Sequence, residues 1–307
     1  MFKSDQAKLW YLNLAILSSG LFAGVMMINV LFFLFAISAL IVMTVRFRYM
    51  FVVLSCLGSL ALCLVFYGAV VAASFAFLVL IPGLLMGYKS RLFNSPNSII
   101  AWGIFPYLLP IGLLITYYPQ LSAQASFIIS EILGMIELSA AEFGIAGNEL
   151  QILYTAIPEI VKWSLRLMPG IFFTLFVSLV FFAYLIATSV SPYFGAVVPR
   201  MNPLYLWKAG EIWLIPLGLG LLLVLSGGNW PKIIGENLLV FMVHFFAFFG
   251  ICVIDFYFKK IKVHLLVRLL IYLFILVAVV VAIPLLAIIG LVDSRFDFRK
   301  ITLSTDS

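Results

Sequence analysis

Residues 236–262 read ENLLVFMVHFFAFFGICVIDFYFKKIK, an apolar run that closes on a cluster of lysines. A helix crosses the hydrocarbon core of a bilayer with about 20 apolar residues, so this run is long enough to span a membrane. It contains three polar side chains for which lipid offers no hydrogen-bond partner, namely Asn237, His244 and Asp255. At about 100° per residue, the three lie within roughly 20° of one another on one helix face. That face must contact protein or a water-filled cavity, so the pattern predicts a bundle of helices around this one.

Composition places the whole chain in the membrane. Of its 307 residues, 65% are hydrophobic and only 10% are charged, and the mean hydropathy is +1.24. Soluble domains do not have this balance, so we predict an all-α, polytopic integral membrane protein. The formal net charge is +6, and the basic residues lie in short loops beside apolar runs. This is the positive-inside pattern of a multi-pass membrane protein, and it argues against a nucleic-acid partner.

Motifs that carry chemistry are sparse. The three cysteines, Cys56, Cys63 and Cys252, lie within apolar runs and show the spacing of neither a disulfide framework nor a metal site. The sequence has no Walker loop, no HExxH and no Gly-x-Ser-x-Gly element. We therefore predict a non-enzymatic protein without a cofactor or a metal ion.

The long apolar runs determine the number of spans that we predict. Residues 10–45 are too long for one crossing and predict two helices with a break near Asn29. Residues 51–87 repeat this layout, with a break near Gly68. A fifth span covers 99–118 and contains prolines, which kink a helix and free backbone carbonyls.

Residues 119–160 differ in character, because they hold five glutamates and no lysine or arginine. The next basic residue is Lys162. Their apolar residues recur at helical spacing, and the sequence GIAGN at 144–148 is typical of a break between helices. We interpret this region as two acidic, amphipathic helices at the membrane interface on the extracytoplasmic side. Pro158 then opens an apolar segment that extends to about Val190.

Three further runs, at 212–226, 236–258 and 264–292, bring the count to nine spans. Nine spans with a cytoplasmic N-terminus put the C-terminus outside, whereas the basic residues after 292 favour the inside. The count is eight if one early hairpin is a single long helix, or if the last run folds back, so we predict eight or nine transmembrane helices. They form one membrane domain over 1–307, with a polar C-terminal tail at 293–307.

The last third of the chain carries a residue pattern that resembles a known family. The pattern is Asn237-Leu238-Leu239, Gly250, Phe256-Tyr257-Phe258-Lys259-Lys260, Gly290-Leu291-Val292-Asp293 and Phe296-Asp297-Phe298-Arg299-Lys300. It resembles the YybS-like family of predicted membrane proteins, a domain of unknown function (2232). The resemblance is clearest over 200–300, and the layout of spans fits the rest of the chain.

The resemblance implies a helical membrane fold and no assigned reaction. The family is similar in architecture to the substrate-binding subunits of energy-coupling-factor vitamin transporters, and to the cell-shape scaffold MreD. These similarities imply a protein of the bacterial cytoplasmic membrane. The first similarity favours a small-molecule ligand, and the second favours a membrane-protein partner.

The polar stripe of Asn237, His244 and Asp255 is the candidate ligand-binding site, because ionisable groups within a membrane usually serve a function. These side chains would line a ligand cavity or a proton path. The alternative is structural, since Asn237 and Asp255 lie near the two membrane interfaces and a single buried histidine commonly serves packing.

Two further segments are candidate docking surfaces for a partner. Gly20 and Gly24 form a small-residue face on the first helix, which resembles the face that docks the partner in vitamin-transporter subunits. Asp293, Asp297 and Arg299 lie in the sequence DSRFDFRK, whose alternating charges fit either a docking tag or a local salt-bridged helix end. Packing within the monomer is the alternative for both segments.

Two functions therefore stand as alternatives. The leading hypothesis is a small-molecule-binding or transport-associated membrane subunit, and it expects a cavity beside the helix at 236–258. The second hypothesis is a non-enzymatic scaffold that docks other membrane proteins. A membrane enzyme acting on lipid ranks last, because only the loop at 191–211 holds suitable polar residues at an interface.

Overall fold

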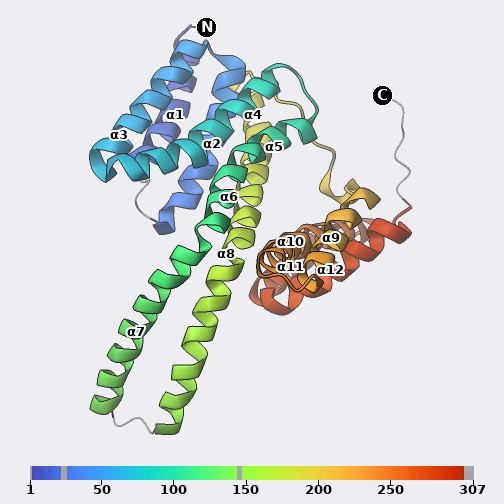
Figure 1. Ribbon diagram of the computed structural model, residues 1–307. Helices are drawn as coiled ribbons and strands as arrows, with labels where there is room; N and C mark the ends of the chain where they lie inside the picture. The colour runs from blue at the N-terminus through green and yellow to red at the C-terminus, as the bar shows by residue number, and fades with distance from the viewer. Residues whose placement is uncertain (1, 22–25, 144–146, 301–307) are drawn as a thin grey trace. The chain divides into compact units, whose positions relative to one another are not determined.

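The computed structural model describes residues 2–21, 26–143 and 147–300, and most of them lie in helices (Figure 1). No strand occurs within these ranges. The prediction of an all-α chain is therefore confirmed. Of the predicted sites, Gly24 lies outside the described residues, as does the end of the C-terminal tail.

The chain divides into two compact units, each built from two separate segments. The first unit comprises Met1–Pro110 and Leu175–Met201, and the second comprises Ile111–Thr174 and Asn202–Ser307. We describe each unit by itself. That the two form one membrane domain stays a prediction.

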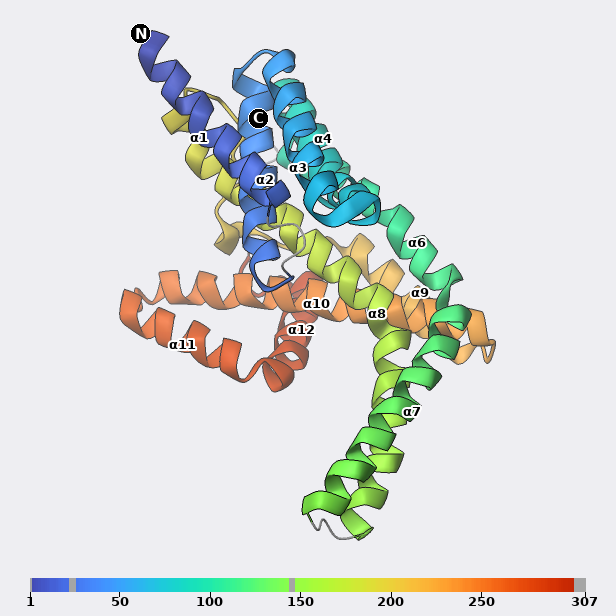
Figure 2. The same ribbon diagram turned by 90° about the vertical axis from the view of Figure 1, so that its left-hand side faces the viewer.

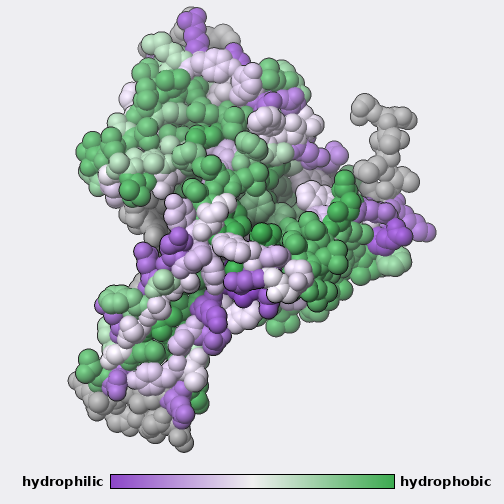
Figure 3. Space-filling view, viewed as in Figure 1, coloured by the Kyte–Doolittle hydropathy of each residue, from purple (hydrophilic) through white to green (hydrophobic). Residues whose placement is uncertain are grey.

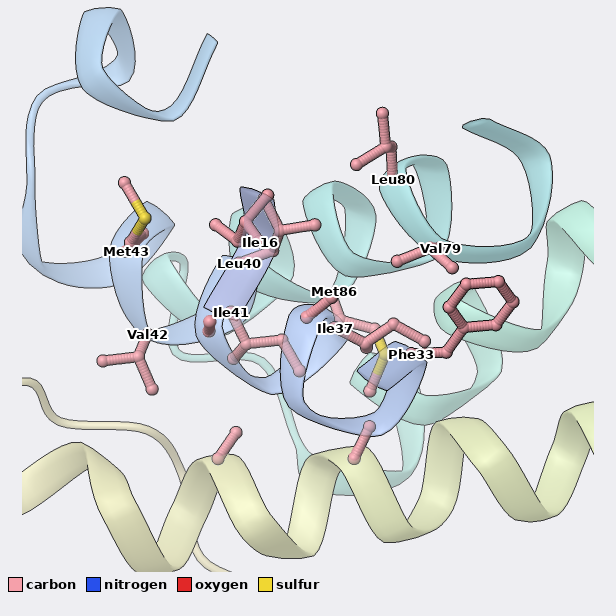
Figure 4. Packing of buried hydrophobic residues seen from close by; sticks show 14 of the residues in the cluster. Ile16, Phe33, Ile37, Leu40, Ile41, Val42, Met43, Val79, Leu80 and Met86 are labelled. Carbon is pink, nitrogen blue, oxygen red and sulfur yellow. The ribbon is translucent and has the colours of Figure 1, made fainter. Parts of the chain in front are cut away.

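The first unit is built around a buried central helix. Its helices are α1 (Phe2–Leu21), α2 (Met26–Arg46), α3 (Tyr49–Phe75), α4 (Ile81–Arg91), α5 (Pro96–Ile104) and the C-terminal part of α8 (Gly147–Val190). Residues 36–44 of α2 are all buried, because α2 packs against α1 and α4 and also against α8, where Ser38 Oγ donates a hydrogen bond to the carbonyl of Ala183 (2.8 Å). Figure 4 shows Ile37 and Leu40 of α2 beside Met86 of α4 in this core.

One of the two predicted helix breaks in this unit lies where the sequence placed it. At Gly68 the backbone has φ 81° and ψ 178°, which interrupts α3 as predicted. The break predicted near Asn29 is wrong in position, because Asn29 lies within α2 (Met26–Arg46). An asparagine side chain lowers helix propensity by only a fraction of a kcal/mol, so it does not end a helix by itself.

Prolines act differently in different helices of this protein. The span predicted at 99–118 is α5, a 3₁₀ turn at Phe105–Tyr107 that contains Pro106, and α6 (Leu108–Thr116). By contrast, α8 continues through both Pro158 and Pro169. The prediction that Pro158 opens a new segment is therefore wrong: the helix tolerates the proline, and Gly147–Val190 is one element of 44 residues.

The second unit holds the remaining helices. They are α7 (Tyr118–Phe143), the N-terminal part of α8, α9 (Leu214–Leu225), α10 (Asn229–Lys260), α11 (Leu265–Val277) and α12 (Val279–Phe296). Helix α10 packs mainly against α9 and α12. The apolar run at 264–292 is two helices that meet at Ala278 rather than one span, as Figure 2 shows for α11 and α12.

Six helices in the described part of the chain are long and apolar enough to cross a membrane. They are Tyr49–Arg91, Pro96–Thr116, Tyr118–Ser139, Gln151–Phe194, Asn229–Lys260 and Val279–Phe296. Three more apolar helices are shorter, namely Phe32–Arg46, Glu211–Leu225 and Leu265–Val277. A multi-span membrane protein is thus supported, whereas the predicted count of eight or nine is not confirmed. The interfacial placement of 119–160 also stays a prediction.

Candidate functional site

The side chain of Asn237 joins α10 to the backbone of α8. Its Oδ1 accepts a hydrogen bond from the backbone N–H of Gly170 (2.6 Å), and its Nδ2 donates to the carbonyl of Arg166 (2.9 Å). These are the two groups that pair with each other in an uninterrupted α-helix, four residues apart. Pro169 lies between them and has no N–H of its own. The buried amide of Asn237 therefore adds hydrogen bonds to backbone groups next to a proline.

Gly170 is required by the closeness of the two helices. A Cβ at this position would lie 2.7 Å from the carbonyl oxygen of Asn237 and 3.0 Å from its Oδ1. Real Cβ atoms do not approach a backbone oxygen so closely, so a larger residue would push α8 away from α10. The glycine thus allows the short hydrogen bond between the two helices.

An ion pair lies beside this amide. Nε of Arg166 on α8 donates to Oε2 of Glu236 on α10, and the two side chains are only 16% and 12% exposed. The guanidinium carbon of Arg166 also lies 5.7 Å from the ring centroid of Trp163. Within the described chain, Nη2 of Arg166 is buried and has no hydrogen-bond partner. We call Arg166, Gly170, Glu236 and Asn237 the Arg166 site.

The structure does not bring His244 and Asp255 to the Arg166 site. Along α10 they lie about 10 Å and about 27 Å from Asn237, at 1.5 Å of rise per residue. Nδ1 of His244 lies 2.7 Å from the carbonyl oxygen of Val240, so this nitrogen carries the proton and donates. Asp255 accepts a hydrogen bond from the hydroxyl of Tyr272 (3.3 Å) and pairs with Lys259 (3.6 Å). The three residues share a helix face but have separate partners.

Sequence reasoning missed the partner of Arg166. The sequence predicts local pairing of Arg166 and Lys162 with Glu159, and Lys162 does lie 3.9 Å from Glu159. Arg166 instead pairs with Glu236, which is 70 residues away. The sequence does show Arg166 as a cation inside an apolar segment, four residues before Gly170. It gives no information on which acidic residue pairs with Arg166.

Asp293 and Arg299 form a second buried ion pair, at the end of α12. Nε and Nη2 of Arg299 both donate to Oδ2 of Asp293, at 3.1 Å and 2.8 Å. The side chain of Arg299 is 0% exposed and that of Asp293 is 2% exposed. The same guanidinium donates to the backbone carbonyls of Tyr205 (2.9 Å) and Trp207 (2.5 Å). We call these four residues the Arg299 clasp.

Neighbouring residues strengthen the attachment of the chain end to the loop before α9. Asp297 pairs with Lys208 (3.4 Å), Arg295 pairs with Glu211 (3.1 Å), and Ser294 Oγ donates to the carbonyl of Ala209 (3.1 Å). The contacts of Asp293, Asp297 and Arg299 in the structure are thus within the chain. Their role in docking a partner stays a prediction.

Glycines mark the closest helix crossings. A Cβ on Gly250 would lie 2.1 Å from the carbonyl oxygen of Leu286, and one on Gly290 would lie 2.0 Å from that of Phe246, so α10 and α12 touch through their backbones. In the first unit, a Cβ on Gly20 would lie 2.3 Å from the carbonyl oxygen of Ser59, which places α1 directly against α3. Gly20 therefore makes a packing contact, and its docking role stays a prediction.

Within residues 2–21, 26–143 and 147–300, no group of three or more histidine, cysteine, aspartate or glutamate side chains could hold a metal ion. The Arg166 site is the candidate functional site because it combines a buried charge pair with an unused donor.

Replacing Asn237 by leucine tests the structural part of this site. Leucine fills a similar volume but removes the hydrogen bonds that Asn237 makes with the N–H of Gly170 and the carbonyl of Arg166. A hydrogen bond contributes about 0.5–1.5 kcal/mol net, so for the two bonds we expect a loss of about 1–3 kcal/mol in the free energy of unfolding, measured in detergent. Asn202→Leu is the matched control, because Asn202 is exposed. Equal losses in the two variants would contradict the bridging role of Asn237.

The fold and these sites define a polytopic helical membrane protein whose second unit is held together by buried polar contacts. The model of a family described as "Predicted membrane protein (DUF2232)" matches residues 13–294, and the chain belongs to this family. The YybS-like resemblance is thereby confirmed. No curated protein and no solved structure matches the chain.

Proposed function

We propose that this protein is a small-molecule-binding membrane subunit associated with transport, and that the ligand binds at the Arg166 site. The observation that carries this proposal is the buried Arg166–Glu236 ion pair, in which Nη2 of Arg166 lacks a partner among the described residues. A buried donor without a partner is costly, and a ligand oxygen would satisfy it. The ligand is therefore a molecule that offers a carbonyl or carboxylate oxygen to Arg166.

The cost of burying charge supports a role beyond stability. Removing a carboxylate and a guanidinium from water costs several kcal/mol each, and a buried pair often contributes no more stability than apolar residues of the same size. Arg166 and Glu236 lie in helices that are otherwise long and apolar enough to span a membrane. Ionisable residues in such positions commonly mark the path or binding site of a substrate.

The surroundings of the pair support a link to transport. Substrate sites of membrane transporters often lie where a helix is interrupted and its freed backbone groups face the site. Here α8 continues through Pro169, which removes one backbone donor, and a side chain from α10 binds the adjacent backbone groups. Exchange of these bonds would allow α8 to change its geometry at this point.

Mass spectrometry of the protein purified from native membranes tests the proposal. The protein is extracted in mild detergent and analysed intact and after denaturation, so that retained small molecules are identified. The decisive variant is Arg166→Gln combined with Glu236→Gln, because it removes both charges and does not leave one buried carboxylate alone. We expect this double variant to lose at least 90% of the retained molecule.

A matched control separates binding from a general effect of charge removal. Lys162→Gln combined with Glu159→Gln removes an exposed pair from the same helix, at side-chain exposures of 65% and 63%, and should keep the ligand. Circular dichroism checks that both double variants remain helical. The proposal fails if wild type retains nothing beyond what an unrelated multi-span protein retains, or if both double variants retain the ligand equally.

A second candidate function is a scaffold that docks another membrane protein, and one observation favours it. Phe296 and Phe298 at the chain end are 70% and 52% exposed and stack on each other, with ring centroids 6.2 Å apart. Substituting both by serine should release a co-purifying partner, whereas serine at the equally exposed Leu265 and Leu266 should not. Recovery of the wild-type protein alone would rule out this candidate.

A further inference from the structure

The net charge of the protein belongs entirely to the first unit. The two segments of this unit, 1–110 and 175–201, contain seven lysines and arginines and one acidic residue, Asp5, which gives the full formal charge of +6. In the second unit the basic and acidic residues are equal in number. The first unit thus combines a strong positive charge with an almost complete lack of carboxylates.

Segments far apart in the sequence bring several of these basic residues to one end of the unit. The guanidinium carbon of Arg91, at the end of α4, lies 4.6 Å from the ring centroid of Tyr49, at the start of α3. The loop after α8 reaches the same end, because a Cβ on Gly195 would lie 3.5 Å from Nε of Arg46 at the end of α2. Hydrophilic residues lie along the upper end of this unit in Figure 3, above a largely hydrophobic surface.

We define the basic face as Arg48, Lys89, Arg91 and Arg200. Arg48, Arg91 and Arg200 are exposed, and Lys89 is half-buried with its Nζ 4.3 Å from the ring centroid of Trp102. Apart from Asp5, the unit contains no Asp or Glu that could neutralise this face. An anionic partner from outside the unit is therefore the electrostatic complement of the face.

Large apolar side chains surround the basic face. Met50 and Phe93, next to the basic helix ends, are 69% and 71% exposed, and Leu92 is 54% exposed. Lysines and arginines mixed with exposed apolar and aromatic residues at the ends of membrane-length helices are typical of the depth of lipid headgroups. A soluble anion would explain the charges but not the apolar surround.

We propose that the basic face binds the headgroups of anionic phospholipids in the leaflet where these helix ends lie. Cytoplasmic leaflets are rich in anionic lipid, and the positive-inside pattern places basic helix ends on that side. Guanidinium and ammonium groups donate to the phosphate oxygens, while the apolar surround contacts the upper acyl chains. Each basic residue near such a surface strengthens binding by about fivefold.

Native mass spectrometry of the full-length, delipidated protein tests this proposal by titration with short-chain phosphatidylglycerol or phosphatidylcholine. We expect wild type to prefer phosphatidylglycerol, and we expect the variant with Arg48, Lys89, Arg91 and Arg200 all changed to glutamine to bind it at least tenfold more weakly. The matched control changes Lys232, Lys260, Lys262 and Lys300 to glutamine, because these four are exposed bases of the second unit. The control should change the affinity for phosphatidylglycerol less than twofold.

Several outcomes would overturn the proposal. The proposal fails if wild type shows no preference between the two lipids, or if both quadruple variants lose the preference equally. Displacement of phosphatidylglycerol by millimolar inorganic phosphate would identify a soluble-anion site instead. An acidic protein that co-purifies with wild type and is lost from the basic-face variant, without any lipid preference, would identify a protein partner. If the basic-face variant does not fold, the salt dependence of wild type decides: binding of phosphatidylglycerol must weaken as salt increases, since exposed charges are screened. Binding that does not change with salt would overturn the proposal.

Discussion

Replacing Gly290 by alanine is expected to destabilise the packing of α10 against α12 strongly. The new Cβ would lie 2.0 Å from the carbonyl oxygen of Phe246 and 2.7 Å from the backbone nitrogen of Gly250. Neither atom belongs to a side chain that can rotate away, so the two helices must separate. Overpacking of a core costs about 1–3 kcal/mol and sometimes more, and we expect a loss at or above the top of that range.

Gly218 in α9 provides the matched control for this prediction. A Cβ on Gly218 meets no atom within 4 Å, so alanine there adds only helix propensity and should be neutral or stabilising by up to about 1 kcal/mol. Unfolding free energy in mixed micelles, together with the monodisperse fraction on size exclusion, measures both variants. Equal behaviour of Gly290→Ala and Gly218→Ala would show that the backbones do not touch at this crossing.

Replacing Arg299 by alanine is the second substitution with a large expected effect. It leaves the carboxylate of Asp293 almost completely buried without its cation, and it removes the donors to the carbonyls of Tyr205 and Trp207. Breaking a buried ion pair from one side costs about 3–5 kcal/mol. We therefore expect Arg299→Ala to lower the free energy of unfolding by that amount and to expose the loop before α9 to proteolysis.

The neighbouring pair of Arg295 and Glu211 supplies the comparison. These side chains also meet between α12 and the same loop, at 3.1 Å, but they are 62% and 63% exposed. Exposed pairs are worth about 0–1 kcal/mol, so Arg295→Ala should have little effect on unfolding or proteolysis. A similar cost for the two arginine substitutions would mean that burial of the Arg299 clasp does not matter for stability.

The sequence was sufficient for the helical class and for some helix ends. Apolar length and composition predicted membrane helices, and Gly68 broke its helix because glycine adopts a positive φ without strain. The local pair of Glu159 and Lys162 followed from helical spacing. These features depend on residues close together in the chain, which is why pattern and propensity could find them.

Features that depend on tertiary contacts could not be predicted in this way. That the run at 264–292 folds back was one alternative from the span count, but its position at Ala278 has no glycine or proline to indicate a break. The proximity of Arg166 to Glu236 depends on the packing of α8 against α10, on which hydropathy gives no information. The family pattern, by contrast, has a physical explanation, since Asn237, Gly250 and Gly290 occupy helix contacts in the second unit.

The predicted ligand stripe illustrates the limit of helical geometry. Asn237, His244 and Asp255 do share one face of α10, but a common face spans the whole length of a helix. Their neighbours on other helices differ, and those neighbours decide what each polar group binds. The Arg166 site keeps Asn237 and adds two charged residues that the stripe did not include.

The Arg299 clasp has a consequence for synthesis of the chain. The carbonyl of Trp207 leaves the ribosome well before its donor, because Arg299 follows 92 residues later. At about 5–20 residues per second, the interval is roughly 5–20 s. During that time the loop before α9 must rely on water or on a chaperone for its hydrogen bonds. Quality control that samples this loop would therefore distinguish chains that have formed the Arg299 clasp from chains that have not.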